Sequence, residues 1–159
     1  MDLTFALEGG RFNVRAAAVI VDRGRLLVMR DERSPYYYIP GGRIGFGESA
    51  EQAVLRELRE ELEIEAEAER LLWVVESFFT EEVDNERYHE LAYYFQVDVS
   101  KTGLLERGDE FTLTEGGRHR HVFSWMPFAE VETAYLYPTF LRGRINRLPT
   151  ATEHLVEVE

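Results

Sequence analysis

The stretch that most constrains this chain runs from Gly41 to Ile64 and joins a glycine-rich segment to a charged helix. Four of the seven residues from 41 to 47 are glycine, which favours a turn whose backbone can approach a ligand closely. The helix that follows carries Glu57, Glu60 and Glu61. Because an α-helix turns about 100° per residue, these three carboxylates fall within one arc of about 100°. The sequence therefore predicts an acidic helix face directly behind a glycine turn.

The apolar residues of this helix, Val54, Leu58 and Leu62, occupy the neighbouring arc and are expected to pack on a core. Carboxylates held this close raise one another's pKa unless a cation lies between them. Mg2+ in proteins is usually bound by a few carboxylates together with substrate phosphates. The pattern favours metal-assisted chemistry on a phosphate-containing substrate. The segment RELREE taken alone is more typical of a solvated helix face supported by Glu–Arg pairs.

The spacing across residues 42–64 is more specific than the short segment. Five residues separate Gly42 from Glu48, seven more separate Glu48 from Arg56, and the sequence then continues as ELREELEI. This resembles the box of the Nudix hydrolase family, G-x5-E-x7-R-E-U-x-E-E-x-G-U, where U is an aliphatic residue. Every defined position matches except one, because Glu63 stands where the family has glycine.

The resemblance implies the Nudix fold, an α/β (α+β) architecture with a mixed β-sheet sandwiched between α-helices. It implies that Mg2+ or Mn2+ is bound by Glu57, Glu60 and Glu61 together with Gly42. Glu57 is either a ligand or the base that orients water. The backbone of Gly41 and Gly42 is expected to contact metal or substrate.

The remaining site residues come from inside and outside the box. Arg56 is expected to fix a glutamate in place through a salt bridge. In this family the base that accepts a proton from water also occurs in a later loop, where Glu115 is the first candidate, ahead of Glu110 and Glu90. The catalytic residues expected are thus Arg56, Glu57, Glu60, Glu61 and Glu115. Arg15 and Arg30 are candidate phosphate ligands near strand ends, although each also fits a solvated surface arginine.

Glu48 and Glu63 of the box each have two possible roles. Glu48 either supports the metal site or caps the helix, a role that Ser49 also fits. Glu63 either takes the left-handed conformation at the helix C-terminus, at a cost of about 1 kcal/mol, or the helix ends differently. Neither alternative removes a metal ligand.

The amino-acid composition limits the kinds of binding partner and the cellular location that are expected. The 159 residues carry a net charge of −12, which argues against binding to nucleic acid and to an anionic membrane surface. There is no cysteine and no run of 18 apolar residues, and the first ten residues do not resemble a signal peptide, so a cytoplasmic location is expected. The length favours a single domain over residues 1–159. A homodimer is compatible with the sequence, with the aromatic stretch 92–95 at its interface.

Periodicity and turn residues predict strands before and after the box helix, with further helices late in the chain. The expected strands are 3–7, 11–22, 26–29, 36–39, 66–80, 89–99, 119–126 and 154–158. Helices are expected at 128–135 and 139–147, and residues 100–118 are expected to form a long loop. His119 and His121 share one strand face and are interpreted as surface residues.

These observations favour a divalent-metal-dependent hydrolase that cleaves a phosphoanhydride bond in a nucleoside diphosphate linked to another moiety. The alternative is a Nudix-fold protein that senses a nucleotide without cleaving it. Such proteins usually lose box glutamates, and this chain retains them. A prenyl diphosphate isomerase of related fold is disfavoured because its chemistry wants a cysteine, which this chain lacks.

Overall fold

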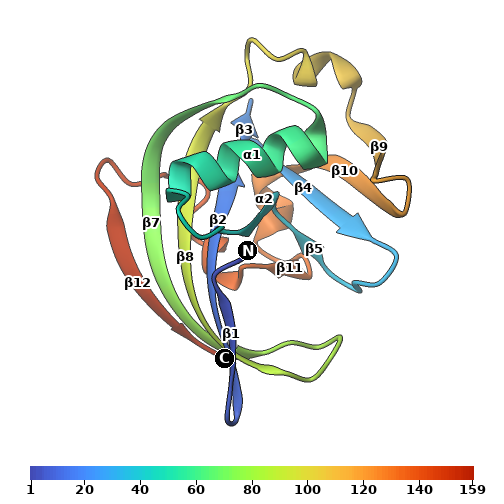
Figure 1. Ribbon diagram of the computed structural model, residues 1–159. Coiled ribbons are helices and arrows are strands. Elements are labelled where there is room, and N and C mark those ends of the chain that lie inside the picture. Colours follow the sequence, from blue (N-terminus) through green and yellow to red (C-terminus); the bar gives the residue numbers. More distant parts are fainter.

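A computed structural model describes all 159 residues, and its strands form two mixed sheets (Figure 1). The first sheet has the order β1 (Thr4–Leu7), β2 (Gly10–Val19), β8 (Arg87–Asp98), β7 (Glu67–Thr80) and β12 (Glu153–Val158), and β6 (Gly41–Arg43) also pairs with β2. The second sheet has the order β11 (Leu136–Tyr137), β5 (Tyr37–Tyr38), β4 (Arg25–Asp31), β10 (His119–Pro127) and β9 (Glu110–Glu115), and β3 (Val21–Asp22) pairs with β4. Parallel pairing joins β2 to β8, β12 to β7 and β11 to β5.

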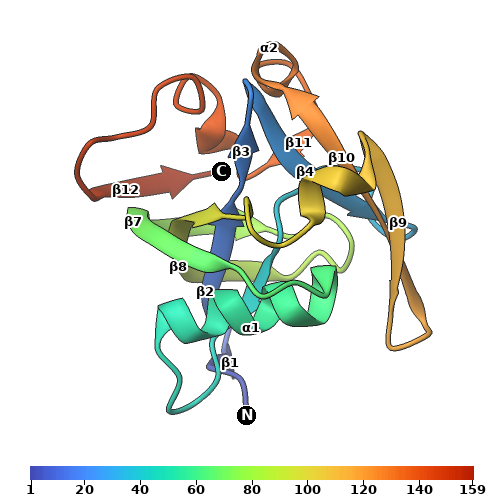
Figure 2. The same ribbon diagram turned by 90° about the horizontal axis from the view of Figure 1, so that it is seen from above.

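The helical elements are few and mostly short. They are α1 (Ala50–Leu62), α2 (Phe128–Val131) and two 3-10 turns, η1 (Leu104–Arg107) and η2 (Thr139–Leu141). Helix α1 lies across one face of the first sheet (Figures 1 and 2). The expected α+β class is confirmed by these mixed sheets and helices. Neither helix combines the length and the apolar character that crossing a bilayer requires.

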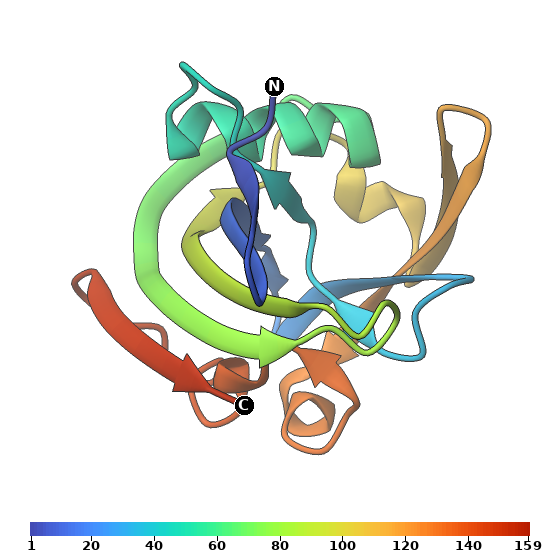
Figure 3. The same cartoon turned by 60° about the horizontal axis from the view of Figure 1, so that its bottom comes forward.

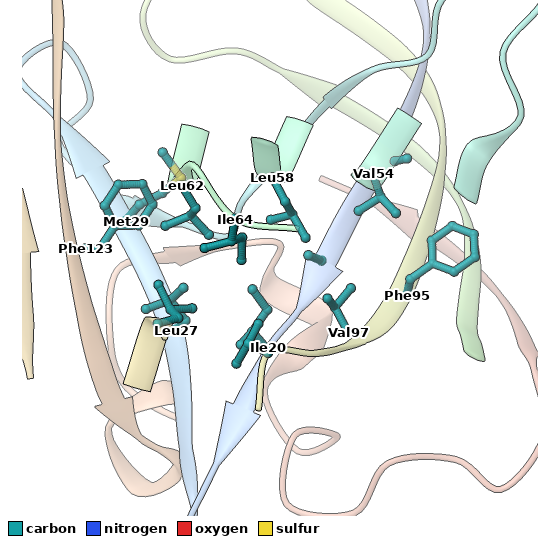
Figure 4. Packing of buried hydrophobic residues seen from close by; sticks show 14 of the residues in the cluster. Ile20, Leu27, Met29, Val54, Leu58, Leu62, Ile64, Phe95, Val97 and Phe123 are labelled. Carbon is teal, nitrogen blue, oxygen red and sulfur yellow. The ribbon is translucent and has the colours of Figure 1, made fainter. Parts of the chain in front are cut away.

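Two apolar clusters lie on opposite faces of β2, because successive residues of a strand point to opposite sides. Ala16 and Ala18 belong to the cluster under α1, whereas Ala17 and Val19 belong to the other. Figure 4 shows the helix side chains of the first cluster directed at Ile20, Val97 and their neighbours. The predicted apolar face of α1 is confirmed, since Val54, Leu58 and Leu62 are fully buried. Burial of each contributes about 2 kcal/mol.

Both ends of α1 follow capping rules. Ser49 is the N-cap, and its hydroxyl accepts a hydrogen bond from the backbone N–H of Gln52, whose side chain accepts from the N–H of Ser49. At the other end Glu63 adopts φ 56° and ψ 42°, the left-handed conformation. The helix therefore ends at the position where the family has glycine. Glu63 adopts the left-handed conformation there, which is sterically less favourable for glutamate than for glycine.

Several expected elements differ from the structure. Residues 41–43 form strand β6 instead of a turn, because they pair with β2. The expected loop 100–118 contains η1 and β9. Its polar composition concealed an alternation in which Phe111 and Leu113 pack on the first cluster between exposed neighbours. The helices expected at 128–135 and 139–147 are limited to α2 and η2, and turns complete both segments.

The stretch 92–95 is not an available interface. It lies in β8, which is paired on one side with β2 and on the other with β7. Ala92, Tyr94 and Phe95 are buried in the two clusters. The proposal that this stretch joins two protomers is therefore wrong, because strand propensity alone does not distinguish a central strand from an exposed edge.

Candidate active site

The two glycines of β6 bring the box helix against the first sheet. Gly41 pairs with Ala17 and Gly42 with Ala16. A Cβ on Gly42 would lie 2.2 Å from Oε1 of Glu57, and one on Gly41 would lie 2.5 Å from the carbonyl oxygen of Ala16. No side chain fits at position 41, where the obstacle is backbone, and a side chain at position 42 would displace the Glu57 carboxylate. These glycines are thus required for close approach of backbone and carboxylate.

Glu61 is the most deeply buried carboxylate of the box, with 7% of its surface exposed. The backbone N–H of Gly41 donates to Glu61 Oε1 at 3.0 Å. Burial, with the nearby charge of Glu57 as the next cause, raises the pKa of Glu61 to about 8. Burial also raises the pKa of Glu57, against the opposing effect of Arg56. Two adjacent carboxylates that resist simultaneous ionisation form an environment that a cation would stabilise.

Arg56 holds the outer part of the box together. Its Nε and one terminal nitrogen donate to the two oxygens of Glu48 at 2.7 and 2.9 Å. The other terminal nitrogen donates to Glu57 at 2.9 Å and to Glu60 at 3.3 Å. A further bond reaches the carbonyl oxygen of Arg43 at 3.0 Å. Arg56 therefore acts on the orientation of other groups, as a positioning residue.

Glu48 is a partner of Arg56 and not a helix cap. Its Oε1 accepts from the backbone N–H of Gly45 at 2.9 Å, and hydrogen bonds from Arg56 are the largest cause of its lowered pKa. The cap position belongs to Ser49. Glu48 thus links the segment before α1 to the middle of the helix.

The carboxylates of the box are suitable ligands for a divalent cation, but their side chains do not all point to one position. No three acidic or histidine side chains converge on a point where they would together hold an ion. Glu57 and Glu61 face the glycine strand, while Glu60 is exposed and directed to Arg56. The fit rests on the mutual repulsion of Glu57 and Glu61 and on the space that Gly42 leaves beside them.

Glu115 lies at the end of β9, within electrostatic reach of the box. Its charge is among those that raise the pKa of Glu61. An oxygen of Glu115 lies 3.9 Å from Nδ1 of His121, which is buried and makes no hydrogen bond. The interpretation of His121 as a surface residue is wrong, because His121 is buried on the face of β10 that it shares with Phe123, a residue of the first cluster. His119 is exposed as expected.

Arg15 connects the box to a cavity on the other face of the first sheet. Its guanidinium makes no hydrogen bond or salt bridge to protein, although Arg15 lies between the box carboxylates and Glu90. Burial alone would lower the pKa of Arg15, but the charges of Glu90, Tyr94, Glu61 and Glu57 outweigh it and raise the pKa. The cavity has a volume of about 260 Å³.

Sequence reasoning found some of the cavity wall and missed the rest. Its lining includes Arg15, Tyr36, Tyr38, Glu90, Tyr94 and Glu157. The sequence pattern placed Tyr94 at a dimer interface and gave Glu157 no role, although Glu90, Ala92 and Tyr94 alternate along one face of β8 and provide a usable signal. The structure places Arg30 elsewhere: it is exposed, lies over the ring of Tyr37 at 5.4 Å and does not line the cavity.

Mixed sheets, a carboxylate helix and a glycine strand facing it define a protein of the Nudix class. A family model described as a Nudix domain matches residues 11–144. The chain therefore belongs to the Nudix hydrolase family.

Solved structures share this fold at low sequence identity. A MutT protein from Methanosarcina mazei is 20% identical over 89% of this chain and 95% of its own, with a TM-score of 0.59. An ADP-ribose pyrophosphatase from Streptococcus suis is 17% identical over 91% of this chain and 98% of its own, with a TM-score of 0.56. A UDP-X diphosphatase is 16% identical over 90% of this chain and 66% of its own, with a TM-score of 0.55. The comparison with curated proteins gave no match.

Proposed function

We propose that this protein hydrolyses a phosphoanhydride bond in a nucleoside diphosphate linked to another moiety, with a divalent metal as cofactor. The observation that carries the proposal is the contact of the box with the glycine strand: Glu57 packs on Gly42, and Glu61 accepts from the N–H of Gly41. The proposed substrate class is supported by two proteins of the same fold, an ADP-ribose pyrophosphatase and a UDP-X diphosphatase.

Glu57, Glu60, Glu61 and the backbone of Gly42 are the groups that would hold Mg2+ or Mn2+. The metal would neutralise phosphate charge and lower the pKa of a bound water. Within the chain, Glu57 and Glu61 are fixed by the glycine strand, and Arg56 restrains Glu57 and Glu60. Fixed carboxylates favour the reaction because little reorganisation is needed when the substrate binds.

Two residues outside the box complete the proposed site. Arg15 has no protein partner for its guanidinium and lies between the box and the cavity, so it is available to pair with a phosphate oxygen of the substrate. Glu115 is the proposed acceptor of the proton from the attacking water, since its charge acts on Glu61 from a separate strand. Arg30 takes no part in this proposal.

The test is a substrate panel of nucleoside triphosphates, ADP-ribose, dinucleoside polyphosphates, NADH and nucleotide sugars, with Mg2+ and with Mn2+. Release of phosphate and nucleotides is measured for the wild type, Glu61→Gln and Glu51→Gln. Glu61→Gln keeps an oxygen to accept from Gly41 but removes the charge, and activity should fall by a factor on the order of 100. Glu51 is exposed on the first turn of the same helix and serves as the matched control.

Metal-dependent cleavage of one substrate class that Glu61→Gln loses and Glu51→Gln keeps would support the proposal. Equal turnover by Glu61→Gln would contradict the assignment of the site. Saturable nucleotide binding without cleavage of any compound would favour the nucleotide sensor instead.

A further inference from the structure

The charged lining of the cavity next to Arg15 is almost entirely acidic. The glutamates that line it are Glu81, Glu82, Glu90, Glu157 and Glu159, and Arg15 is the only basic residue among them. A diphosphate would be repelled by such a wall. The phosphates of a substrate therefore belong beside Arg15 and the box, and the cavity remains for the part of the substrate that is not phosphate.

The inner end of the cavity contains polar groups without a full set of partners. Glu90 is 9% exposed, and its Oε2 accepts from Nδ2 of Asn13 at 2.8 Å, while its Oε1 makes no hydrogen bond to protein. Tyr94 is 4% exposed, and its hydroxyl has no hydrogen-bond partner in the protein. Buried polar groups normally have partners, so these two groups are suited to meet a ligand.

Aromatic rings form much of the remaining wall. Tyr36 lies edge-to-face with Tyr137 at 4.9 Å between ring centroids and with Tyr38 at 6.2 Å. The hydroxyl of Tyr36 donates to Glu81 at 2.9 Å, which increases the electron density of the ring. Rings of this kind attract cations through their negative faces. The aromatic rings and the carboxylates that line this cavity thus both favour a positively charged ligand.

The wall is assembled at one end of the first sheet from segments far apart in the sequence. Figure 3 shows the end of β7 near the C-terminus and near the segments that follow β10. The register agrees, because Val158 of β12 pairs with Phe78 of β7. At about 260 Å³ the cavity is smaller than the roughly 300–1,000 Å³ typical of sites for drug-sized ligands, and it suits one group of a substrate rather than all of it.

We propose that this cavity binds a positively charged nitrogen group of the substrate, either a quaternary ammonium or an N-methylated purine. The inference rests on the proposed function, in which the box acts on the diphosphate that carries this group. Glu90 and the outer glutamates supply the charge, the tyrosine rings supply the faces, and Arg15 separates the cation from the phosphates.

The first experiment measures binding of the isolated groups to the metal-free protein by calorimetry, so that catalysis is not required. Choline is compared with its neutral isostere 3,3-dimethylbutan-1-ol, and 7-methylguanosine with guanosine. The charged member of at least one pair should bind about tenfold more tightly, and that pair identifies the kind of cation. Equal affinities within both pairs, or no saturable binding of either charged member, would overturn the inference.

A double variant tests whether the acidic wall causes this preference. Glu81→Gln with Glu157→Gln removes two charges from the lining, while the new amide at position 81 retains an oxygen for the hydroxyl of Tyr36. Affinity for the charged member should fall and that for its neutral partner should not. Glu67→Gln with Glu130→Gln, at two exposed sites away from the cavity, changes net charge equally, and thermal unfolding verifies the fold of both proteins. An equal loss for both ligands would count against the inference.

Turnover separates this inference from the proposed function. CDP-choline and CDP-glycerol form one charged and neutral pair of substrates, and 7-methyl-GTP and GTP form another. Hydrolysis without preference for charge in either pair would support the hydrolase and reject the cation site. Binding selectivity for the cation without hydrolysis of any compound would support the cavity and reject the hydrolase.

Discussion

The box and the cavity balance negative charge in different ways. In the box, Arg56 bonds three glutamates and one carbonyl oxygen, so that each of its nitrogen atoms has a partner. In the cavity, five glutamates line the wall together with Arg15, whose guanidinium bonds none of them. Carboxylates held by a bidentate arginine are fixed in position, whereas carboxylates without such a partner are left to meet a ligand. The comparison indicates that the box is built for precise chemistry and the cavity for recognition.

Gly42→Ala should have the largest effect, because it disturbs the fixed arrangement of carboxylates in the box. The new Cβ would lie 2.2 Å from the Glu57 carboxylate, which must move. We expect kcat/KM to fall about 100-fold, since displacement of a catalytic group by about 1 Å has effects of this size. Steady-state kinetics on the best substrate of the panel provides the measurement.

Gly45→Ala is the matched control for this change. Its Cβ would lie 3.4 Å from the nearest atom, Oε1 of Glu48, which is nearly an ordinary contact. Wild-type kinetics for Gly42→Ala, or equal losses in the two variants, would show that the close approach of Glu57 to the glycine strand is not required.

Arg56→Lys should have the next largest effect, because it keeps the positive charge and removes the fork that holds Glu48, Glu57 and Glu60. We expect kcat to fall by about tenfold to 100-fold while KM changes little, since Arg56 orients catalytic groups without being placed in the cavity. Arg59→Lys is the control, because Arg59 is exposed and pairs only with Glu65 at 3.6 Å. A change confined to KM would place Arg56 in substrate binding.

The pH dependence of stability should distinguish the buried box carboxylate from the exposed ones. The pKa of Glu61 is about 8 in the folded protein, against an ordinary value of 4.5. Between these values the folded state binds more protons than the unfolded state, so the free energy of unfolding of the metal-free protein should decrease as pH rises from about 4.5 to 8.

Urea unfolding at a series of pH values measures this decrease. Glu61→Gln should flatten it, because the titrating group is gone. Mg2+ should also oppose it, since a cation stabilises the ionised carboxylate in the folded state. An identical pH dependence in the wild type and in Glu61→Gln would mean that Glu61 is not the group that titrates.

Glu63→Gly should have the smallest effect and lies outside both charged regions. Glycine removes the cost of the left-handed conformation at φ 56° and a negative charge at the C-terminal end of α1. We expect a gain of up to about 1 kcal/mol in the free energy of unfolding, without a change in kcat/KM. Lower stability of the variant would show that the side chain of Glu63 contributes interactions that exceed its backbone cost.

The sequence by itself determined the helix and its acidic face. The spacing of residues 42–64 predicted the family and the apolar arc of α1, and both are confirmed. It left two alternatives for the end of the helix, and the structure selects the left-handed conformation at Glu63. These features depend on contacts within about four residues, which a periodic pattern records directly. The assignment of Ser49 as the cap follows from the same local rules.

The tertiary structure decided which distant residues share the site. Arg15 lines the cavity and Arg30 does not, and strand pairing determines this difference. Glu90 and Glu157 meet because β12 pairs with β7 and β7 with β8. β6 became a strand rather than a turn because β2 offered it a pairing edge. Hydrogen bonds between segments far apart in the chain set these contacts, and no local periodicity encodes them.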